Sequence, residues 1–590
     1  MQNPLLSAAE ETNDREYRTF QANGGFTLKL FKGLSFRNTT GMRYQTRRND
    51  VFYGDKSITA KRSSINGSIQ NLETGSFQTS NVLNYNWSGK GHDVTAMVGQ
   101  EYVDRWNRNF KAAASNFPND DIGLADLSLG LPTAVQSAEN YDDKLLSFFA
   151  RVNYDYDNKY LLSLSIRRDE SSKFHKDNRV GYFPSVSAGW NVHQEKWFQN
   201  PVMSKLKIRA SYGELGANFL NPYNFDAIAY GPIPYTVGGE RYVTGRAAYL
   251  KSKDLKWETA KTTDIGIELG FFNNDLTLSL DYFVKKNVDL LAQIDLNLSS
   301  GQIFEINSSR EKPYVNTASV KNTGWEFMMN YRKQLTKDFH IDATFNIATL
   351  KNKVLSLGEN VQPITSGAMS SYFNDAPSIT MPGEAIGSFY GYKIDGFDAE
   401  GNFIFADMDK NGVVNANDKV ILGSPIPDFT YGLNINMEYK DFDLTLFFQG
   451  VQGNDIFNQK KYTYYFDYSN NVVKEAMNGW TKTNRNTGIP IMKTQNTSGG
   501  NSLPSEFYIE DGSYLRLKNL QLGYSLPKKW LEAIRFNKLR VYAGVQNLFT
   551  LTKYSGYDPE VSSNVLFSRG IDISSYPNAR TFTFGFNASF

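Results

Sequence analysis

The sequence contains no cysteine in 590 residues. Disulfides, thiolate metal sites and cysteine nucleophiles are therefore excluded, and the lack of thiols is compatible with an oxidising compartment. Long apolar runs are also missing, because stretches such as 444–448 are interrupted by polar residues, whereas a membrane-spanning helix needs about 18 consecutive apolar residues. The N-terminus shows no basic segment followed by an apolar one, so either the precursor is longer or the chain is not exported.

An excess of charge of one sign is absent as well. Lys and Arg number 63 and Asp and Glu number 61, so no broad basic field exists and nucleic acid is not an expected partner. Histidine is scarce, and the four histidines share no paired motif: His92, His175, His193 and His340. A lipase on a barrel would need a serine beside one of them. We predict that the chain is not an enzyme.

The chain is nevertheless rich in aromatic residues. Aromatic residues make up 14% of the sequence, while the mean hydropathy is −0.46. Many rings in a chain that is hydrophilic on average are typical of a water-lined barrel.

Apolar and polar residues alternate with a period of two along nearly the whole chain, which predicts strands with two different faces. The last segment is the clearest example. Its even positions carry Phe582, Phe584, Phe586, Ala588 and Phe590, and its odd positions carry Thr581, Thr583, Gly585, Asn587 and Ser589. The same pattern recurs at 146–155, 206–212, 276–282 and 431–439.

A soluble β-sandwich would also alternate, but three features favour a membrane barrel. The strands have about 10 residues or more, and tyrosines and tryptophans cluster near their ends. Short turns at 157–159 and 273–274 contrast with long insertions at 218–254 and 452–509, as in porin-type barrels. We therefore predict an all-β fold, a transmembrane antiparallel β-barrel.

The strand count predicts which part of a barrel this is. About 17 strands are expected, although a single-chain bacterial barrel closes with an even number. The first clear strand begins near Tyr17, and nothing before it could fill a lumen. We therefore interpret residues 1–590 as the C-terminal part of a 22-stranded barrel of the plugged-transporter class, without a plug domain.

Several segments resemble SusC/RagA-like TonB-dependent transporters. The segment 580–590, preceded by Ser575, Tyr576, Pro577 and Asn578, resembles their closing strand. Further similar stretches cover essentially the whole chain: 181–190, 207–213, 255–259, 281–283, 322–326, 423–429, 515–519 and 546–550.

This resemblance implies import of oligosaccharides across the outer membrane, or alternatively of oligopeptides as in the RagA type. It implies a SusD-like surface lipoprotein as partner, outer-membrane lipid around the wall, and energy from the TonB–ExbB–ExbD complex through an N-terminal Ton box and plug that this sequence lacks. A passive pore or an adhesion barrel is the other alternative. The residues that contact substrate are not predicted.

One local motif predicts a metal site. Residues 407–418 fit an EF-hand-like calcium loop, with glycine at position 6 for the sharp turn. The candidate ligands are Asp407, Asp409, Asn411, the Val413 carbonyl, Asn415 and Asp418. Position 12 is Asp rather than Glu, and the flanking residues favour strands over helices, so an Asx-rich turn without metal is the competing interpretation. Bound Ca²⁺ would stiffen the loop, and no other cofactor is expected.

Overall fold

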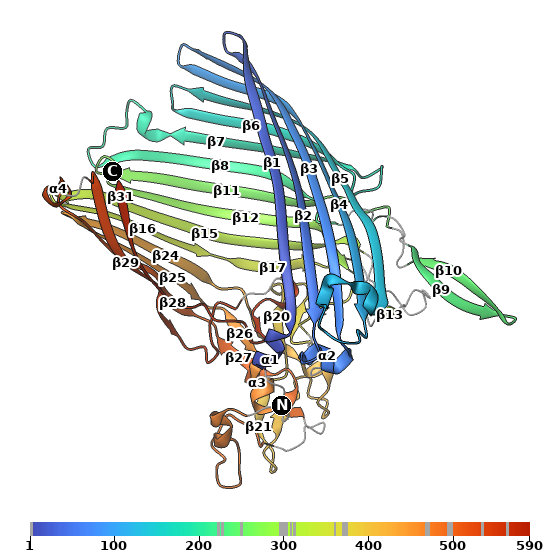
Figure 1. The fold of residues 1–590 in the computed structure, drawn as a ribbon. Coiled ribbons are helices and arrows are strands. Elements are labelled where there is room, and N and C mark those ends of the chain that lie inside the picture. Colours follow the sequence, from blue (N-terminus) through green and yellow to red (C-terminus); the bar gives the residue numbers. More distant parts are fainter. Residues whose placement is uncertain are drawn as a thin grey trace. The chain divides into compact units, whose positions relative to one another are not determined.

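The computed structural model describes residues 4–220, 225, 229–247, 252–293, 305–306, 309–310, 314–358, 361–367, 376–466, 472–492, 500–532, 536–561 and 566–589. Strands dominate this part of the chain (Figure 1). Its α-helices have only five or six residues each, and none is long and apolar enough to cross a membrane.

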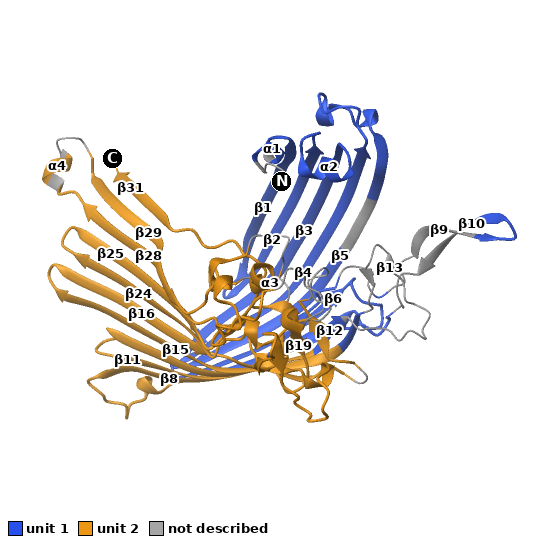
Figure 2. Ribbon diagram, turned by 90° about the horizontal axis from the view of Figure 1, so that it is seen from below, with its two compact units in different colours: residues 1–187, 213–259, 289–316 blue, residues 188–212, 260–288, 317–590 orange. Residues whose placement is uncertain are grey.

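Eighteen strands of the described residues belong to one sheet. Alternation in the sequence predicted about 17 strands. Neighbouring strands in the sheet run antiparallel. The prediction of an all-β, antiparallel fold is therefore confirmed, and the total of 22 strands stays a prediction. The chain divides into two compact units, coloured separately in Figure 2: residues 1–187, 213–259 and 289–316, and residues 188–212, 260–288 and 317–590.

Unit 1 contains six long strands that pair in chain order. They are β1 (Glu11–Phe31), β2 (Leu34–Tyr53), β3 (Asn66–Gly89), β4 (His92–Ser115), β5 (Leu131–Tyr156) and β6 (Tyr160–Ser171). The first strand begins at Glu11 rather than near Tyr17, because Glu11 and Thr12 pair with Tyr53 and Phe52 at the end of β2. Alternation at 11–16 is too weak for sequence reasoning to find this extension, and the ladder with β2 creates it.

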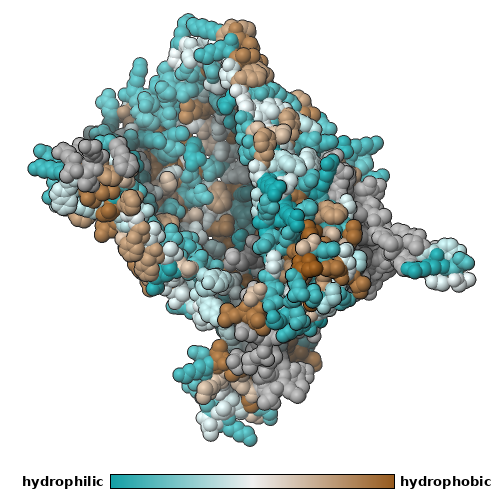
Figure 3. All heavy atoms as spheres, viewed as in Figure 1, coloured by the Kyte–Doolittle hydropathy of each residue, from teal (hydrophilic) through white to brown (hydrophobic). Residues whose placement is uncertain are grey.

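The strands of unit 1 keep the predicted division into two faces. In β6, the side chains of Leu162, Leu164 and Ile166 are exposed and alternate with Ser163 and Ser165. The apolar face continues onto the two neighbouring strands. Ile166 lies opposite Ala150 on β5, and Ala150 lies opposite Val98 on β4. Figure 3, in the same view as Figure 1, shows hydrophilic and hydrophobic residues next to one another on the surface.

Tight turns join several of these strands. Asp157 and Asn158 both have positive φ, 51° and 53°, as do Lys90 and Gly91 at 52° and 82°. Two successive residues with positive φ match the right-handed twist of an antiparallel hairpin, and Asn, Asp and Gly adopt this conformation with little strain. The short turn predicted at 157–159 is therefore confirmed. The long insertion at 218–254 contains a separate hairpin of β9 (Ala229–Val237) and β10 (Glu240–Ala247).

Unit 2 continues the antiparallel pattern with a second ladder, in the order β16, β24, β25, β28, β29 and β31. These strands are β16 (Phe339–Thr349), β24 (Phe429–Tyr439), β25 (Phe442–Gln452), β28 (Tyr514–Ser525), β29 (Lys538–Thr552) and β31 (Thr581–Ser589). The other strands of the sheet are β7 (Val180–Asn191), β8 (Met203–Ala217), β11 (Glu258–Phe271), β12 (Leu276–Gln293), β15 (Tyr314–Thr336) and β17 (Lys351–Ser356). The C-terminal Phe590 lies outside the described residues.

The long connections of unit 2 fold around a core of their own. Its short elements include β20 (Ser388–Gly391), β22 (Phe403–Phe405), β23 (Val420–Gly423), β26 (Asp455–Asn458), α3 (Lys460–Tyr465), β27 (Ile509–Asp511) and β30 (Ile571–Asp572). Phe389, Phe457 and Tyr508 are fully buried in this core, and the rings of Phe457 and Tyr508 stack at 5.0 Å. Burying such side chains contributes about 1.5–3 kcal/mol each. This core therefore holds together three connections that lie far apart in the sequence, and its described members belong to no strand of the large sheet.

Candidate functional site

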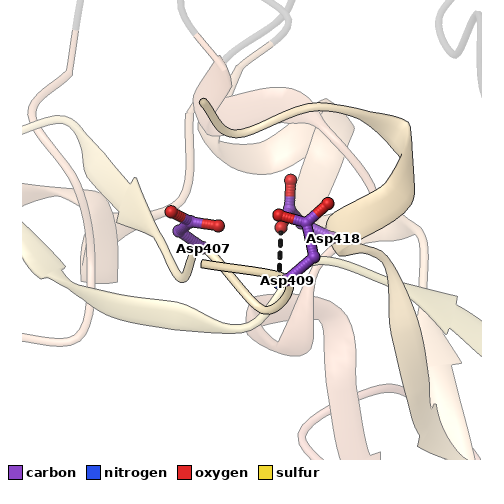
Figure 4. A group of neighbouring side chains, drawn as sticks. All are labelled: Asp407, Asp409 and Asp418. Atoms are coloured by element: carbon purple, nitrogen blue, oxygen red, sulfur yellow. Dashed lines mark hydrogen bonds between the residues drawn. The ribbon is translucent and has the colours of Figure 1, made fainter. Parts of the chain in front are cut away.

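The acidic loop predicted from sequence lies in unit 2, between two short strands. Asp407 follows β22, and Asp418 ends a 3₁₀ turn just before β23. The flanks are therefore extended, as the sequence predicts. The carboxylates of Asp407, Asp409 and Asp418 offer oxygens that all lie within 4.8 Å of one another, and the side chains come together in Figure 4.

Backbone amides hold these carboxylates in place. The amides of Asn411 and Gly412 donate to Asp407 at 3.2 and 2.8 Å. Asp418 accepts from the amides of Met408 at 2.8 Å and Asp409 at 3.3 Å. Gly412 has φ +86° with nothing within 4 Å of an added Cβ, so the loop needs glycine for its backbone conformation and not for space.

Asp418 is the buried member of the group. The amide of Asn415 donates to its carboxylate at 2.7 Å. This hydrogen bond is the largest cause that lowers the pKa of Asp418, and the amides of Asp409 and Met408 lower it further against the effect of burial. The three neighbouring carboxylates supply the kind of oxygen ligands that a hard cation such as Ca²⁺ prefers.

The remaining candidate ligands take part in the turn itself. The Asn411 oxygen accepts from the amide of Val413 at 2.8 Å. The Asn415 side chain caps the 3₁₀ turn by accepting from Asn417, and its amide donates to the Val413 carbonyl at 3.0 Å. The structure therefore brings Asp407, Asp409 and Asp418 together, and Asn411 joins this group by donating from its side chain to Asp409 at 2.8 Å.

A second candidate region is the polar face of unit 1, opposite Ile166 and its apolar neighbours. Arg167 forms ion pairs with Glu101 at 2.9 Å and with Asp169 at 2.7 Å. It also donates to Ser147 at 2.7 Å. These residues come from three neighbouring strands, so the face is a connected charged surface and not a set of separate charges.

A comparable charged surface occurs on the strands of unit 2. Arg209 pairs with Asp281 at 2.6 Å and with Asp264 at 3.1 Å. Lys205 pairs with Glu268 at 2.7 Å. Sequence alternation predicted strands with a polar face, but it did not predict which charges pair.

Sequence reasoning missed a buried ion cluster in unit 2. Arg516 on β28 is paired with Asp558 at 2.6 Å and with Glu560 at 2.5 Å. Lys518 also binds Glu560 at 2.7 Å, and Asn578 donates to Asp558 at 3.0 Å. The cluster fastens the connection between β29 and β31 to the sheet. No local sequence signal joins residues about 40 positions apart.

Comparison with known proteins identifies the family of this chain. The family described as "TonB dependent receptor-like, beta-barrel" matches residues 3–548. TonB-dependent receptor P3 of Formosa agariphila is 33% identical over 617 residues, which cover 100% of this chain and 60% of that protein. TonB-dependent receptor SusC of Bacteroides thetaiotaomicron is 33% identical over 481 residues, which cover 77% of this chain and 44% of that protein.

Solved structures are similar over almost the whole chain. The RagAB peptide importer in its closed-closed state matches with a TM-score of 0.82 and 25% identity, covering 99% of this chain and 63% of that chain. The chain spans about 60% of the length of the Formosa relatives that it matches.

Proposed function

Because the chain belongs to the TonB-dependent receptor-like β-barrel family of the outer membrane, we propose that it forms wall strands of an active importer for oligosaccharides. The resemblance to SusC/RagA-like transporters, stated above from sequence, is confirmed.

The two-faced sheet of unit 1 is the observation that carries this proposal. One face exposes Leu162, Leu164 and Ile166, which suits lipid. The other face carries the ion pairs of Arg167 with Glu101 and Asp169, which suit a water-filled lumen. A wall of this kind serves passage of hydrated solutes.

Oligosaccharide is the substrate class that we favour. SusC shares 33% identity with this chain, and the polar face offers guanidinium, carboxylate and hydroxyl groups that exchange hydrogen bonds with sugar hydroxyls. Oligopeptide import is the second candidate, because the RagAB peptide importer has a similar fold over 99% of this chain.

Two partners complete the proposal. A SusD-like surface lipoprotein would deliver the substrate from outside the cell. The TonB–ExbB–ExbD complex would supply the energy, because the outer membrane has no energy source of its own.

We further propose that the loop at 407–418 binds Ca²⁺. The clustering of Asp407, Asp409 and Asp418 within 4.8 Å and the positive φ of Gly412 support this assignment. The ion would join three mutually repelling carboxylates and so stiffen the segment between β22 and β23. Its role is structural.

Deletion of the gene tests the import proposal. The deletion strain should lose growth on one class of oligosaccharide and uptake of its fluorescent derivative, while growth on monosaccharides is unchanged. An uncoupler of the inner-membrane proton gradient should abolish uptake in the parent strain. If the deletion abolishes growth on oligopeptides and leaves oligosaccharide uptake intact, the peptide alternative replaces the proposal. Uptake that persists with the uncoupler indicates a passive pore.

A further inference from the structure

A pocket of about 490 Å³ opens on the polar face of unit 1. It lies on strands β2 to β5 and on the segment that follows β6. Its polar lining includes Arg43, Gln45, Arg105, Asn107, Asp143 and Lys173. Neither the acidic loop at 407–418 nor the ion pairs of Arg167 belong to it.

Strand register assembles the pocket from distant residues. Arg43 on β2 lies opposite Ser76 on β3, Ser76 lies opposite Arg105 on β4, and Arg105 lies opposite Asp143 on β5. One residue row therefore crosses four strands. In a second row, two residues further along, Gln45, Thr74 and Asn107 are successive partners. Directly opposed residues share one face of a sheet, so the two rows form a single floor.

The pocket carries an excess of positive charge. Asp143 pairs with Arg105 at 3.0 Å and with Lys173 at 3.5 Å. Arg43 lies beside this group without being part of it. Among the described residues that line it, three cationic side chains face one carboxylate, an excess of two positive charges. The Arg105 side chain is 57% exposed and thus accessible to a ligand.

Two buried acceptors in the pocket lack donors. The Oδ1 atom of Asp143 and the Oδ1 atom of Asn107 are buried and have no hydrogen-bond partner in the part of the chain that the structure describes. Asp143 as a whole is 8% exposed. A buried acceptor without a donor is costly, so both atoms are ready to accept from the hydroxyl groups of a ligand.

We propose that this pocket is a binding subsite for an acidic sugar residue. The inference rests on the proposed import function and specifies its substrate class as anionic oligosaccharide. The acid group, carboxylate or sulfate, binds Arg43 and Arg105, because guanidinium groups form strong charge-assisted hydrogen bonds with such groups. Neighbouring sugar hydroxyls donate to Asp143 and Asn107.

The chemistry favours an acidic sugar over other ligands. A neutral sugar brings no negative charge to the two excess cations of the described lining. An acidic peptide supplies the charge, but a single sugar residue places several hydroxyl donors next to its acid group. An acid group beside several hydroxyl groups matches the pocket, because its two rows of residues offer two acceptors and two guanidinium groups.

Binding to the complete chain as its gene encodes it, purified in detergent, tests the inference. Isothermal titration uses four probes: an oligogalacturonate, a sulfated galactan oligosaccharide, a neutral malto-oligosaccharide of equal length and a glutamate-rich peptide. The key variant is Arg43→Gln, which removes one positive charge and leaves the Arg105–Asp143–Lys173 group intact. The matched control is Arg37→Gln, which removes the same charge from the same face of β2 six residues away.

Arg43→Gln should raise the Kd of an acidic saccharide about tenfold or more, as loss of one charge-assisted hydrogen bond does. Arg37→Gln should leave the Kd within about twofold, at the level of a screened distant charge. A response to galacturonate alone assigns a carboxylate, and a response to the sulfated probe alone assigns a sulfate.

Three results would overturn the subsite: equal affinity for neutral and acidic saccharides, equal effects of the two variants, or binding of the peptide alone. These results leave the import proposal standing, because gene deletion and uptake measure it separately. Conversely, unchanged growth after deletion overturns import even when the purified chain binds acidic saccharide through Arg43.

Discussion

Arg516 donates to Asp558 at 2.6 Å, and the two side chains are only 3% and 7% exposed. The pair joins strand β28 to the connection between β29 and β31. Because 42 residues separate the partners, this contact ties a long segment of chain to the sheet.

Loss of Arg516 should loosen that connection. Arg516→Met leaves the carboxylates of Asp558 and Glu560 without their main cation, and removal of one partner of a buried pair costs about 3–5 kcal/mol. We expect a lower thermal midpoint in detergent and faster proteolysis within 553–580. The control is Arg332→Met, which breaks the 2.6 Å pair with Asp342 at a position where the Arg side chain is 65% exposed, and should cost at most about 1 kcal/mol. Equal effects of the two variants would contradict the role assigned to burial.

The ion cluster around Arg516 should lose its stabilising effect at acidic pH. Burial raises the pKa of Asp558, but hydrogen bonds from Arg516 and from the amides of Glu560 and Asn578 outweigh burial, so its pKa lies below the ordinary value of 3.8. An acid whose pKa is lowered by folding stabilises the fold above its unfolded pKa and loses that contribution as pH falls through the folded pKa. Proteolysis within 553–580 should therefore be slow at pH 5 and accelerate below about pH 4. Asp558→Asn should show a smaller change with pH, and an identical pH profile would contradict the assignment.

A second buried pair joins α3 to β30. Lys460 lies 2.7 Å from Asp572, and each side chain is 2% exposed. Tyr554 donates to the same Asp572 oxygen at 2.6 Å. Lys460→Met should lower the free energy of unfolding by about 3–5 kcal/mol because it leaves a buried carboxylate without its cation.

The double variant Lys460→Met/Asp572→Leu separates charge from packing. Replacement of both partners by apolar groups removes the unpaired charge, so the double variant should recover much of the stability lost by the single one. Denaturant unfolding of all four forms gives the coupling free energy. A double variant that is as unstable as the sum of both single variants would show that the pair is not coupled.

Calcium should bind the acidic loop with a stoichiometry of one. Asp407→Ala and Asp409→Ala should abolish the binding heat, because each removes an oxygen from the three-carboxylate group. Asp395→Ala is a suitable control, since Asp395 is an exposed acid on β21 (Ile394–Phe397) outside that group. Saturating calcium should also raise the thermal midpoint of the parent chain and not that of Asp407→Ala. Retained heat in both aspartate variants would rule out this loop as the site.

Local patterns in the sequence were enough for the strand architecture. Successive side chains in a strand point to opposite faces, so alternation such as Phe582, Phe584 and Phe586 against Thr581 and Thr583 predicts both β31 and its two faces. The acidic loop was equally accessible, because the spacing of Asp407, Asp409, Gly412 and Asp418 lies within 12 consecutive residues. The start of the first strand was missed because Glu11 and Thr12 join it only through pairing with β2.

The sequence by itself determined the all-β class, the family resemblance and the acidic loop, because backbone sterics and short turns act over neighbouring residues. Only the tertiary structure decided which distant charges meet. Arg43 and Asp143 share one pocket because the registers of three ladders align their rows, and Arg516 meets Asp558 because a long connection folds back onto β28. Strand register and loop conformation depend on burial and pairing of many residues that lie far apart in the sequence. They therefore cannot be predicted from any single stretch of it.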